Sequence, residues 1–371
     1  MLTCSEQCLT ALEFDTAHGR GDLLQFASLQ GREEWYMAQR SGQVVACRPW
    51  GDACRHLKSS SYTVSFRDGW CAQPGAVRHT RYPMTSILPA VASGDRRAWI
   101  PDGVATLRHR PLRYRRFGRG QPLVLVHGWC CHGGFWTSLV EPLAHHCTLV
   151  VPDLRGHGAS PAREPCDVPG FAQDVCDLVE ALELRDPLLV GHSLGAAAVL
   201  EAVGRLGCPA AGLVLVDPFV FDYGHLEERE VRRLLVPFRR DLPKALRLMV
   251  GNLMGPSVAP QVAEEVALEM ARTPPAVALP ALESLLRWDP ERPLQRLGMP
   301  CIAVATDSGD SRALRRHAGR MRITWMRGTG HFPMIECPGP LTRHIRRALA
   351  AFPAAVSGRD AGRDGSRNLR R

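Results

Sequence analysis

The chain has 371 residues, of which 45% are hydrophobic and 22% are charged, values that are ordinary for a globular protein with one large domain or two modest ones. Its net charge of +9 comes from scattered arginines, and no basic stretch is interleaved with aromatic residues, which argues against a nucleic-acid partner. No run approaches the ~20 apolar residues that span a bilayer, which argues against a membrane span.

The cysteines and the N-terminus indicate the compartment. The 13 cysteines form no Cys-x-x-Cys pair, and several, such as Cys147 and Cys301, stand inside apolar runs. A free cysteine in such a run behaves as a small hydrophobic residue. The N-terminus lacks the basic segment followed by an apolar one that starts a secretory signal. We therefore expect a cytoplasmic protein with free thiols.

Residues 1–101 show no persistent helical or strand periodicity, and turn-forming pairs recur, for example Ser41-Gly42 and Pro74-Gly75. We interpret this stretch as a poorly organised N-terminal extension, either disordered or translated from a misplaced start codon, and assign it no function. Residues 353–371 are rich in glycine, arginine and aspartate and are expected to form a disordered basic tail. The organised domain is predicted over residues 102–352.

Strand-like and helical patterns alternate from residue 102 onward. Residues 103–108 and 112–117 alternate in polarity, as the two strands of a hairpin would. Continuous apolar runs of strand length follow at 122–126, 147–151, 187–190, 212–216 and 301–305. Strands of this kind are buried on both faces, so we predict an α/β fold with a mostly parallel twisted sheet and helices on both faces.

Residues 218–297 interrupt this alternation. Helical segments such as 225–235 and 260–271 occur here, and prolines that include Pro237 and Pro280 are expected to break the helices. We interpret the stretch as an inserted helical cap. Its many leucines, valines and alanines predict a mostly apolar pocket.

The segment Gly191-His192-Ser193-Leu194-Gly195 stands between a predicted strand and a predicted helix. A chain that passes from strand to helix this sharply needs residues without bulk on both sides of the serine, and Gly191 and Gly195 meet that need. The Ser193 hydroxyl is then exposed at the carboxyl end of the strand. The free N–H groups at the start of the following helix point to the same place.

Other residues that could carry chemistry also follow predicted strands. They are Trp129, Asp153, Asp217, Asp307, Asp310 and His331. Ligands of mostly parallel sheets bind at the carboxyl ends of the strands. The sequence therefore predicts a functional site at this edge of the sheet.

Four motifs together resemble the α/β-hydrolase superfamily over roughly residues 102–352. They are His127-Gly128-Trp129, Asp153-Leu154-Arg155-Gly156-His157-Gly158, Gly191-His192-Ser193-Leu194-Gly195 and Gly330-His331-Phe332-Pro333. The resemblance implies that Ser193 is the nucleophile and His331 its base. It implies an oxyanion hole made by the backbone N–H groups of Trp129 and Leu194. The histidines His127 and His192, together with Asp153 and Arg155, are expected to be structural.

The acid that completes the triad stays open at this point. The family usually takes it from the loop after the next-to-last strand, where Asp307 and Asp310 stand. Some members use an acid after the preceding strand, where Asp217 stands. We prefer Asp310, followed by Asp217 and then Asp307. An aspartate without this role is expected to cap a helix or lie on the surface.

The resemblance implies a serine hydrolase that acts on an ester, a lactone or a related acyl substrate. Such chemistry requires no cofactor and no metal, and the partner would be a small-molecule acyl substrate. One alternative is a cofactor-independent C–C hydrolase or dioxygenase that relies mainly on the histidine and the acid. Another is a non-catalytic ligand-binding member of the fold. The oligomeric state is left open.

Overall fold

The computed structural model describes residues 27–28, 35–38, 44–47, 103–107 and 110–352. The chain divides into two units, Met1–Thr80 and Arg81–Arg371. The described part of the first unit is an antiparallel sheet of three short strands, β1 (Ala27–Ser28), β2 (Trp35–Ala38) and β3 (Val44–Cys47). The rest of the predicted extension and the predicted tail, 353–371, lie outside the described residues, so both interpretations stay predictions.

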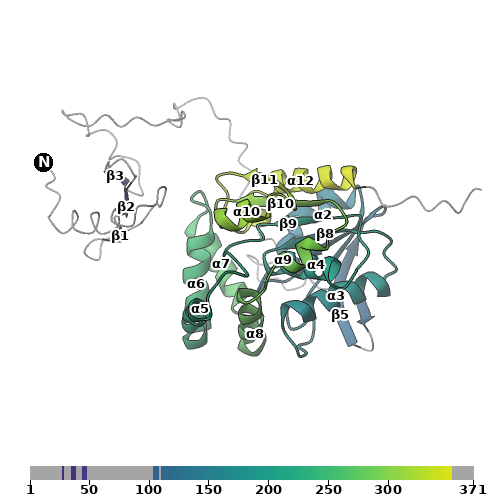
Figure 1. The fold of residues 1–371 in the computed structure, drawn as a ribbon, viewed down its shortest axis with the longest axis horizontal. Helices are drawn as coiled ribbons and strands as arrows, with labels where there is room; N and C mark the ends of the chain where they lie inside the picture. Colours follow the sequence, from purple (N-terminus) through teal and green to yellow (C-terminus); the bar gives the residue numbers. More distant parts are fainter. Residues whose placement is uncertain (1–26, 29–34, 39–43, 48–102, 108–109, 353–371) are drawn as a thin grey trace, which may run out of the picture. The chain divides into compact units, whose positions relative to one another are not determined.

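The second unit contains an eight-stranded sheet (Figure 1). Its strands are β4 (Gly103–Leu107), β5 (Arg110–Phe117), β6 (Pro122–Val126), β7 (Thr148–Pro152), β8 (Leu188–His192), β9 (Gly212–Val216), β10 (Cys301–Thr306) and β11 (Arg322–Met326). Their spatial order is β11-β10-β9-β8-β6-β7-β5-β4. Strand β5 pairs antiparallel with β4 and β7, and every other pairing in this sheet is parallel. The mostly parallel sheet that the sequence predicts is confirmed.

The central strands are apolar on both faces because helices cover both. Every residue of β7, β8 and β9 is buried. Helix α3 (Val168–Ala181) packs against α4 (Leu194–Gly204), and α2 (Thr137–Ala144) packs against α12 (Pro338–Ala351). Figure 1 shows these two pairs on opposite sides of the sheet. Strand β8, which precedes Ser193, lies between β6 and β9 in the middle of this layered core.

The segment between β9 and β10 is helical, as predicted. It forms α5 (Glu228–Arg240), α6 (Leu242–Leu253), α7 (Pro260–Met270), α8 (Pro275–Leu286) and α9 (Glu291–Gln295). Helix α6 packs against α5 and α7, and α5 also packs against α8. We call α5–α8 the cap. Figure 1 shows these four helices grouped together beside the sheet.

Two prolines do not break helices where the sequence predicts that they would. Helix α5 continues through Pro237, and α8 continues through Pro280. Each proline removes one backbone hydrogen bond, but both rings face outward from exposed positions. The opposite face of α8 buries Ala278, Ala281 and other apolar residues. That burial holds the helix together across Pro280.

Two shorter helices, η3 (Gly133–Trp136) and α11 (Pro333–Glu336), follow the loops after β6 and β11, and α10 (Ser311–His317) follows β10. Among the described residues, no helix has both the length and the apolar composition needed to span a membrane.

Candidate active site

Ser193 stands in a strained turn between β8 and α4. Its backbone φ of +51° is rare for a residue with a side chain. A Cβ atom on Gly191 would overlap the Gly195 carbonyl, and one on Gly195 would overlap the carbonyls of Val126 and His127. Both glycines are therefore required, as predicted. The Ser193 backbone N–H donates to Val216 O at 3.0 Å, which fixes the turn against β9.

His331 and Asp217 are in direct contact. Nδ1 of His331 lies 2.7 Å from Oδ2 of Asp217, and the two residues are 5% and 1% exposed. The same carboxylate accepts from the Ser308 hydroxyl at 2.6 Å and from the Thr306 backbone N–H at 3.2 Å. Burial by itself would raise the pKa of Asp217, but the bonds from His331, Ser308 and Thr306 outweigh it and hold this pKa below its usual value. Asp217 is therefore ionised at neutral pH.

The other two candidate acids point elsewhere. The Asp310 carboxylate accepts from the backbone N–H groups of Arg312 and Ala313 at 2.7 and 3.0 Å and so caps α10. Asp307 accepts from the Gly328 N–H at 2.7 Å and pairs with Arg327 at 3.2 Å. Of the three aspartates, Asp217 is the one that the structure brings to His331 within the described part of the chain. Asp310, which the sequence analysis prefers, has the capping contact expected of an aspartate without the triad role.

His192 supports the backbone of His331. Its Nε2–H donates to the His331 carbonyl at 2.7 Å, and the two rings are 4.6 Å apart. Burial, followed by the neighbouring His331, lowers the pKa of His192 to about 3, so this ring is neutral. His127 accepts from the Leu154 N–H at 2.9 Å and connects the loops after β6 and β7. Both contacts are structural, as the sequence analysis expects.

Asp153 and Arg155 support the loop after β7. The Asp153 carboxylate accepts from the Gly133 N–H at 2.7 Å and from the Ala159 N–H at 2.9 Å. Arg155 binds the buried Asp174 with two nitrogens, each at 2.7 Å. These bonds fix the shape of the sheet edge beside Ser193.

The two backbone groups predicted for an oxyanion hole lie at the start of α4 and after β6. Within the described ranges, neither the Leu194 N–H nor the Trp129 N–H donates to a protein acceptor. The Trp129 side chain extends to the cap, where its indole N–H donates to Ala278 O at 2.8 Å. Cys130 follows with φ +57°, and its carbonyl accepts from the Thr273 hydroxyl at 3.3 Å. The loop after β6 is thus hydrogen-bonded to the cap.

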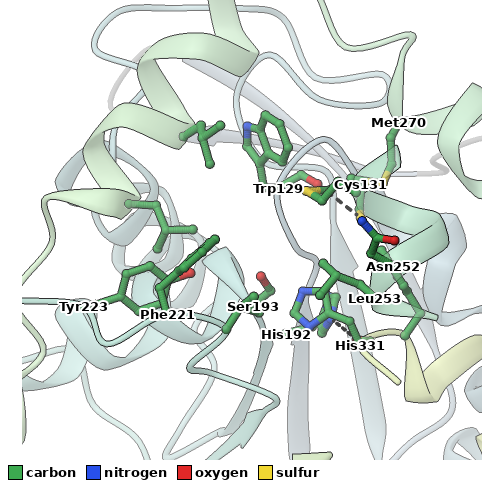
Figure 2. A pocket seen from close by; sticks show the side chains of 15 residues that line it. Trp129, Cys131, His192, Ser193, Phe221, Tyr223, Asn252, Leu253, Met270 and His331 are labelled. Carbon is green, nitrogen blue, oxygen red and sulfur yellow. Dashed lines mark hydrogen bonds between the residues drawn. The ribbon is translucent and has the colours of Figure 1, made fainter. Parts of the chain in front are cut away.

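A cavity of about 180 Å³ opens over Ser193 and His331. Figure 2 shows Phe221 and Tyr223 on one side of Ser193, His331 and Leu253 on the other, and Trp129 across the cavity. Apolar side chains from the cap and the loop before it make up most of the remaining wall: Val220, Met249, Met270, Leu282 and Leu285. Phe332, which follows His331, completes it. The lining residues include no aspartate, glutamate, lysine or arginine. The mostly apolar pocket that the cap composition predicts is present.

Three further residues of this region are not predicted from the sequence. Ser308 stands between Asp307 and Asp310, the two candidate acids after β10. Its hydroxyl is not a candidate for the triad acid, so the sequence gives no reason to select it. Tyr223 and Asn252 come from loop and helix positions that have no motif. Helix α6 also contains Lys244 and Arg247, so the polarity of Asn252 does not distinguish it in the sequence.

The chain is similar to several known proteins. A family model described as the alpha/beta hydrolase family matches residues 123–343. Over 257 residues the chain is 29% identical to a pimeloyl-[acyl-carrier protein] methyl ester esterase of Xanthomonas campestris pv. campestris, a match that covers 64% of this chain and 98% of that protein. A shorter match to a non-heme chloroperoxidase of Kitasatospora aureofaciens is 38% identical over 96 residues, and it covers 25% of this chain and 35% of that protein.

Among solved structures, a thermophilic esterase from Thermogutta terrifontis superposes with a TM-score of 0.59 at 24% identity. The superposition covers 66% of this chain and 94% of that one. At this identity the likeness shows the fold.

Proposed function

Because the chain belongs to the alpha/beta hydrolase family, we propose that it is a serine hydrolase of an ester, a lactone or a related acyl substrate. The observation that carries the proposal is the hydrogen bond between His331 and the buried Asp217, beside the cavity that Ser193 lines. A relative named for the hydrolysis of a methyl ester supports the ester class.

In the proposed mechanism the Asp217 carboxylate accepts a hydrogen bond from the Nδ1–H of His331, which keeps the proton on Nδ1 and leaves Nε2 free to act as the base. Nε2 takes the Ser193 proton while Oγ attacks the carbonyl carbon of the substrate. The N–H groups of Leu194 and Trp129 bind the negative oxygen of the tetrahedral intermediate. His331 then gives its proton to the leaving alcohol as the C–O bond breaks. His331 then takes a proton from water as the water oxygen attacks the acyl carbon, and it returns this proton to Ser193 Oγ as the acyl-serine C–O bond breaks and the acid leaves.

The cavity restricts the substrate in this proposal. A wall without aspartate, glutamate, lysine or arginine favours an uncharged acyl group, because a buried charge without a partner is costly. Tyr223 and Asn252 are the remaining polar side chains of the wall outside the triad residues, His192 and Trp129. We therefore expect short, uncharged acyl groups to react faster than acyl groups that carry a carboxylate inside the cavity.

The test is kcat/KM on a panel of p-nitrophenyl esters of increasing chain length, with fluorophosphonate labelling as a second readout. Ser193→Ala and His331→Ala should each lower kcat by about 10⁶, and the double variant should lose little more, because the pair acts as one unit. Ser193→Ala should also abolish labelling. Ser257→Ala, at an exposed cap position, is the matched control and should match the unmodified protein.

Two outcomes would contradict the proposal. If Ser193→Ala keeps most of its activity while His331→Ala is inactive, the chemistry is that of a C–C hydrolase or dioxygenase. If ligands bind but neither the unmodified protein nor any variant turns them over, the chain is a binding protein.

A further inference from the structure

Glu336 holds the backbone on both sides of His331. Its Oε2 accepts from the Gly330 N–H at 2.8 Å, and its Oε1 accepts from the Phe332 N–H at 3.0 Å. Gly330 and Phe332 are the two chain neighbours of His331, and both are buried. One carboxylate thus fixes the two peptide groups that flank the proposed base.

The same carboxylate reaches the cap. Oε2 also accepts from the N–H of Gly255, just after the end of α6, at 3.0 Å. The next contact in this region runs from the His331 N–H to the carbonyl of Leu253, the last residue of α6, at 2.7 Å. We call residues 327–332, between β11 and α11, the histidine loop. Two bonds therefore connect it to the end of α6, one through Glu336 and one directly.

These segments approach one another so closely that side chains would not fit. A Cβ atom on Gly330 would overlap Leu253 O and the Gly255 N–H, and a Cβ on Gly255 would lie 2.6 Å from Glu336 Oε2. Contact at this distance allows no lateral shift of the histidine loop without loss of the hydrogen bonds. The position of His331 therefore depends on Glu336 and Gly255, which do not line the cavity, and on the carbonyl of Leu253.

We propose that Glu336 is a positioning residue for His331, and that the end of α6 takes part in this positioning through Gly255 and Leu253. The proposal rests on the proposed function, in which His331 is the base. Charge-assisted bonds from a carboxylate to backbone N–H groups are among the stronger hydrogen bonds in proteins. Catalysis is sensitive to them because a shift of a reacting group by about 1 Å can cost about 100-fold in rate.

The first test is Glu336→Gln, which keeps the size of the side chain. Glutamine has one acceptor oxygen, so it cannot accept from Gly330 and Phe332 on opposite oxygens as glutamate does. Because Glu336 is not among the residues that line the cavity, kcat should fall by about 10- to 100-fold while KM changes less than about twofold. The rate of fluorophosphonate labelling should fall by the same factor as kcat.

Glu201→Gln is the matched control. Glu201 is a buried glutamate at the far end of α4, where it accepts from the Trp288 indole at 3.2 Å and from Arg205 at 2.6 Å. Its replacement should lower Tm and leave kcat unchanged. Equal losses of kcat in the two variants, or a loss in Glu336→Gln that matches its fraction of unfolded protein, would overturn the proposal.

Gly255→Ala tests the contribution of the cap. The added methyl group should push against Glu336 and lower kcat, and its effect should not multiply with that of Glu336→Gln, because both variants break the same contact. Fully multiplicative effects would show that the end of α6 acts independently of Glu336.

A readout without turnover separates this proposal from the proposed function. The proton between His331 Nδ1 and Asp217 should give a downfield NMR signal in the ¹⁵N-labelled protein, absent in Asp217→Asn. Glu336→Gln should shift or broaden this signal, and Glu201→Gln should not. An unchanged signal in Glu336→Gln would overturn the positioning role. Activity that survives in Ser193→Ala would overturn only the proposed function.

Discussion

The loops after β9 and β10 begin alike and differ in what their aspartates do. Asp217 follows Val216 directly, and Asp307 follows Thr306 directly, so each stands at the carboxyl end of a parallel strand. Asp217 has φ +42°, and its N–H donates to Val304 O of the neighbouring strand at 2.8 Å. The Asp307 N–H donates to Thr329 O at 3.0 Å, on the side of the edge strand β11.

The two carboxylates consequently have different surroundings. The Asp217 side chain is 1% exposed and accepts three hydrogen bonds, whereas the Asp307 side chain is 46% exposed and pairs with the exposed Arg327. An exposed ion pair contributes little, but a buried carboxylate with matched donors is held in one orientation. The comparison shows that strand position and backbone direction, more than the presence of an acid, decide which aspartate can orient the imidazole.

The largest effect is expected for Asp217→Asn, which removes the carboxylate that contacts His331. The variant should lower kcat/KM by about 10⁴, because asparagine leaves His331 in the wrong tautomer. Circular dichroism should show an unchanged fold. A loss smaller than about tenfold would mean that the acid lies elsewhere.

Ser308→Ala tests how much the loop after β10 contributes to Asp217, since the Ser308 hydroxyl of this loop donates to the Asp217 carboxylate. Loss of one hydrogen bond to a charged group should lower kcat by about tenfold. Ser308→Thr retains a hydroxyl and should keep most of the activity. If the alanine and threonine variants lose equally, loop packing and not the hydroxyl is responsible.

Asp310→Ala should affect stability and not catalysis. Removal of this cap from α10 should lower the free energy of unfolding by about 1 kcal/mol, as measured by urea unfolding, with kcat/KM within about twofold of the unmodified protein. Asp310→Asn, which can still cap, is the control. A loss of activity near that of Asp217→Asn would reverse the assignment of roles.

The smallest effect is in the pH dependence of stability. The pKa of Asp217 is lower in the folded protein than its usual value, so proton binding favours the unfolded chain. The stability that its ionised form contributes is complete about one pH unit above the usual pKa of 3.8 and is lost as the pH falls through the folded pKa. The difference in unfolding free energy between the unmodified protein and Asp217→Asn should therefore change only below about pH 5. A change between pH 5 and 7 would contradict this.

The sequence predicts the sheet, the cap and the turn around Ser193 because each depends on local patterns. Apolar runs of strand length mark buried strands, and the close approach of backbone around Ser193 requires Gly191 and Gly195. The helices that continue through Pro237 and Pro280 were not predictable, because burial of the opposite helix face outweighs the local cost of proline.

The choice of Asp217 over Asp310 was not predictable for a related reason. It depends on a positive φ at Asp217 and on the hydrogen bonds by which Asp310 caps α10. Neither feature changes the spacing of the motifs in the sequence. Glu336 was missed because its bond to Gly255 joins residues 81 positions apart, and its other partners are backbone groups, which any sequence possesses.

The bond between Glu336 and Gly255 also bears on how such proteins can be recombined. Residues 253–255 and 330–336 form one hydrogen-bonded unit, although α7, α8, β10 and β11 lie between them in the chain. A chimera that takes these two segments from different parents should fold but hydrolyse substrate slowly. The exception is a parent segment that places a backbone N–H and a carbonyl where Gly255 and Leu253 have them. Exchanges confined to α7 and α8 leave this unit intact, so we expect that they can change the cavity wall without displacing His331.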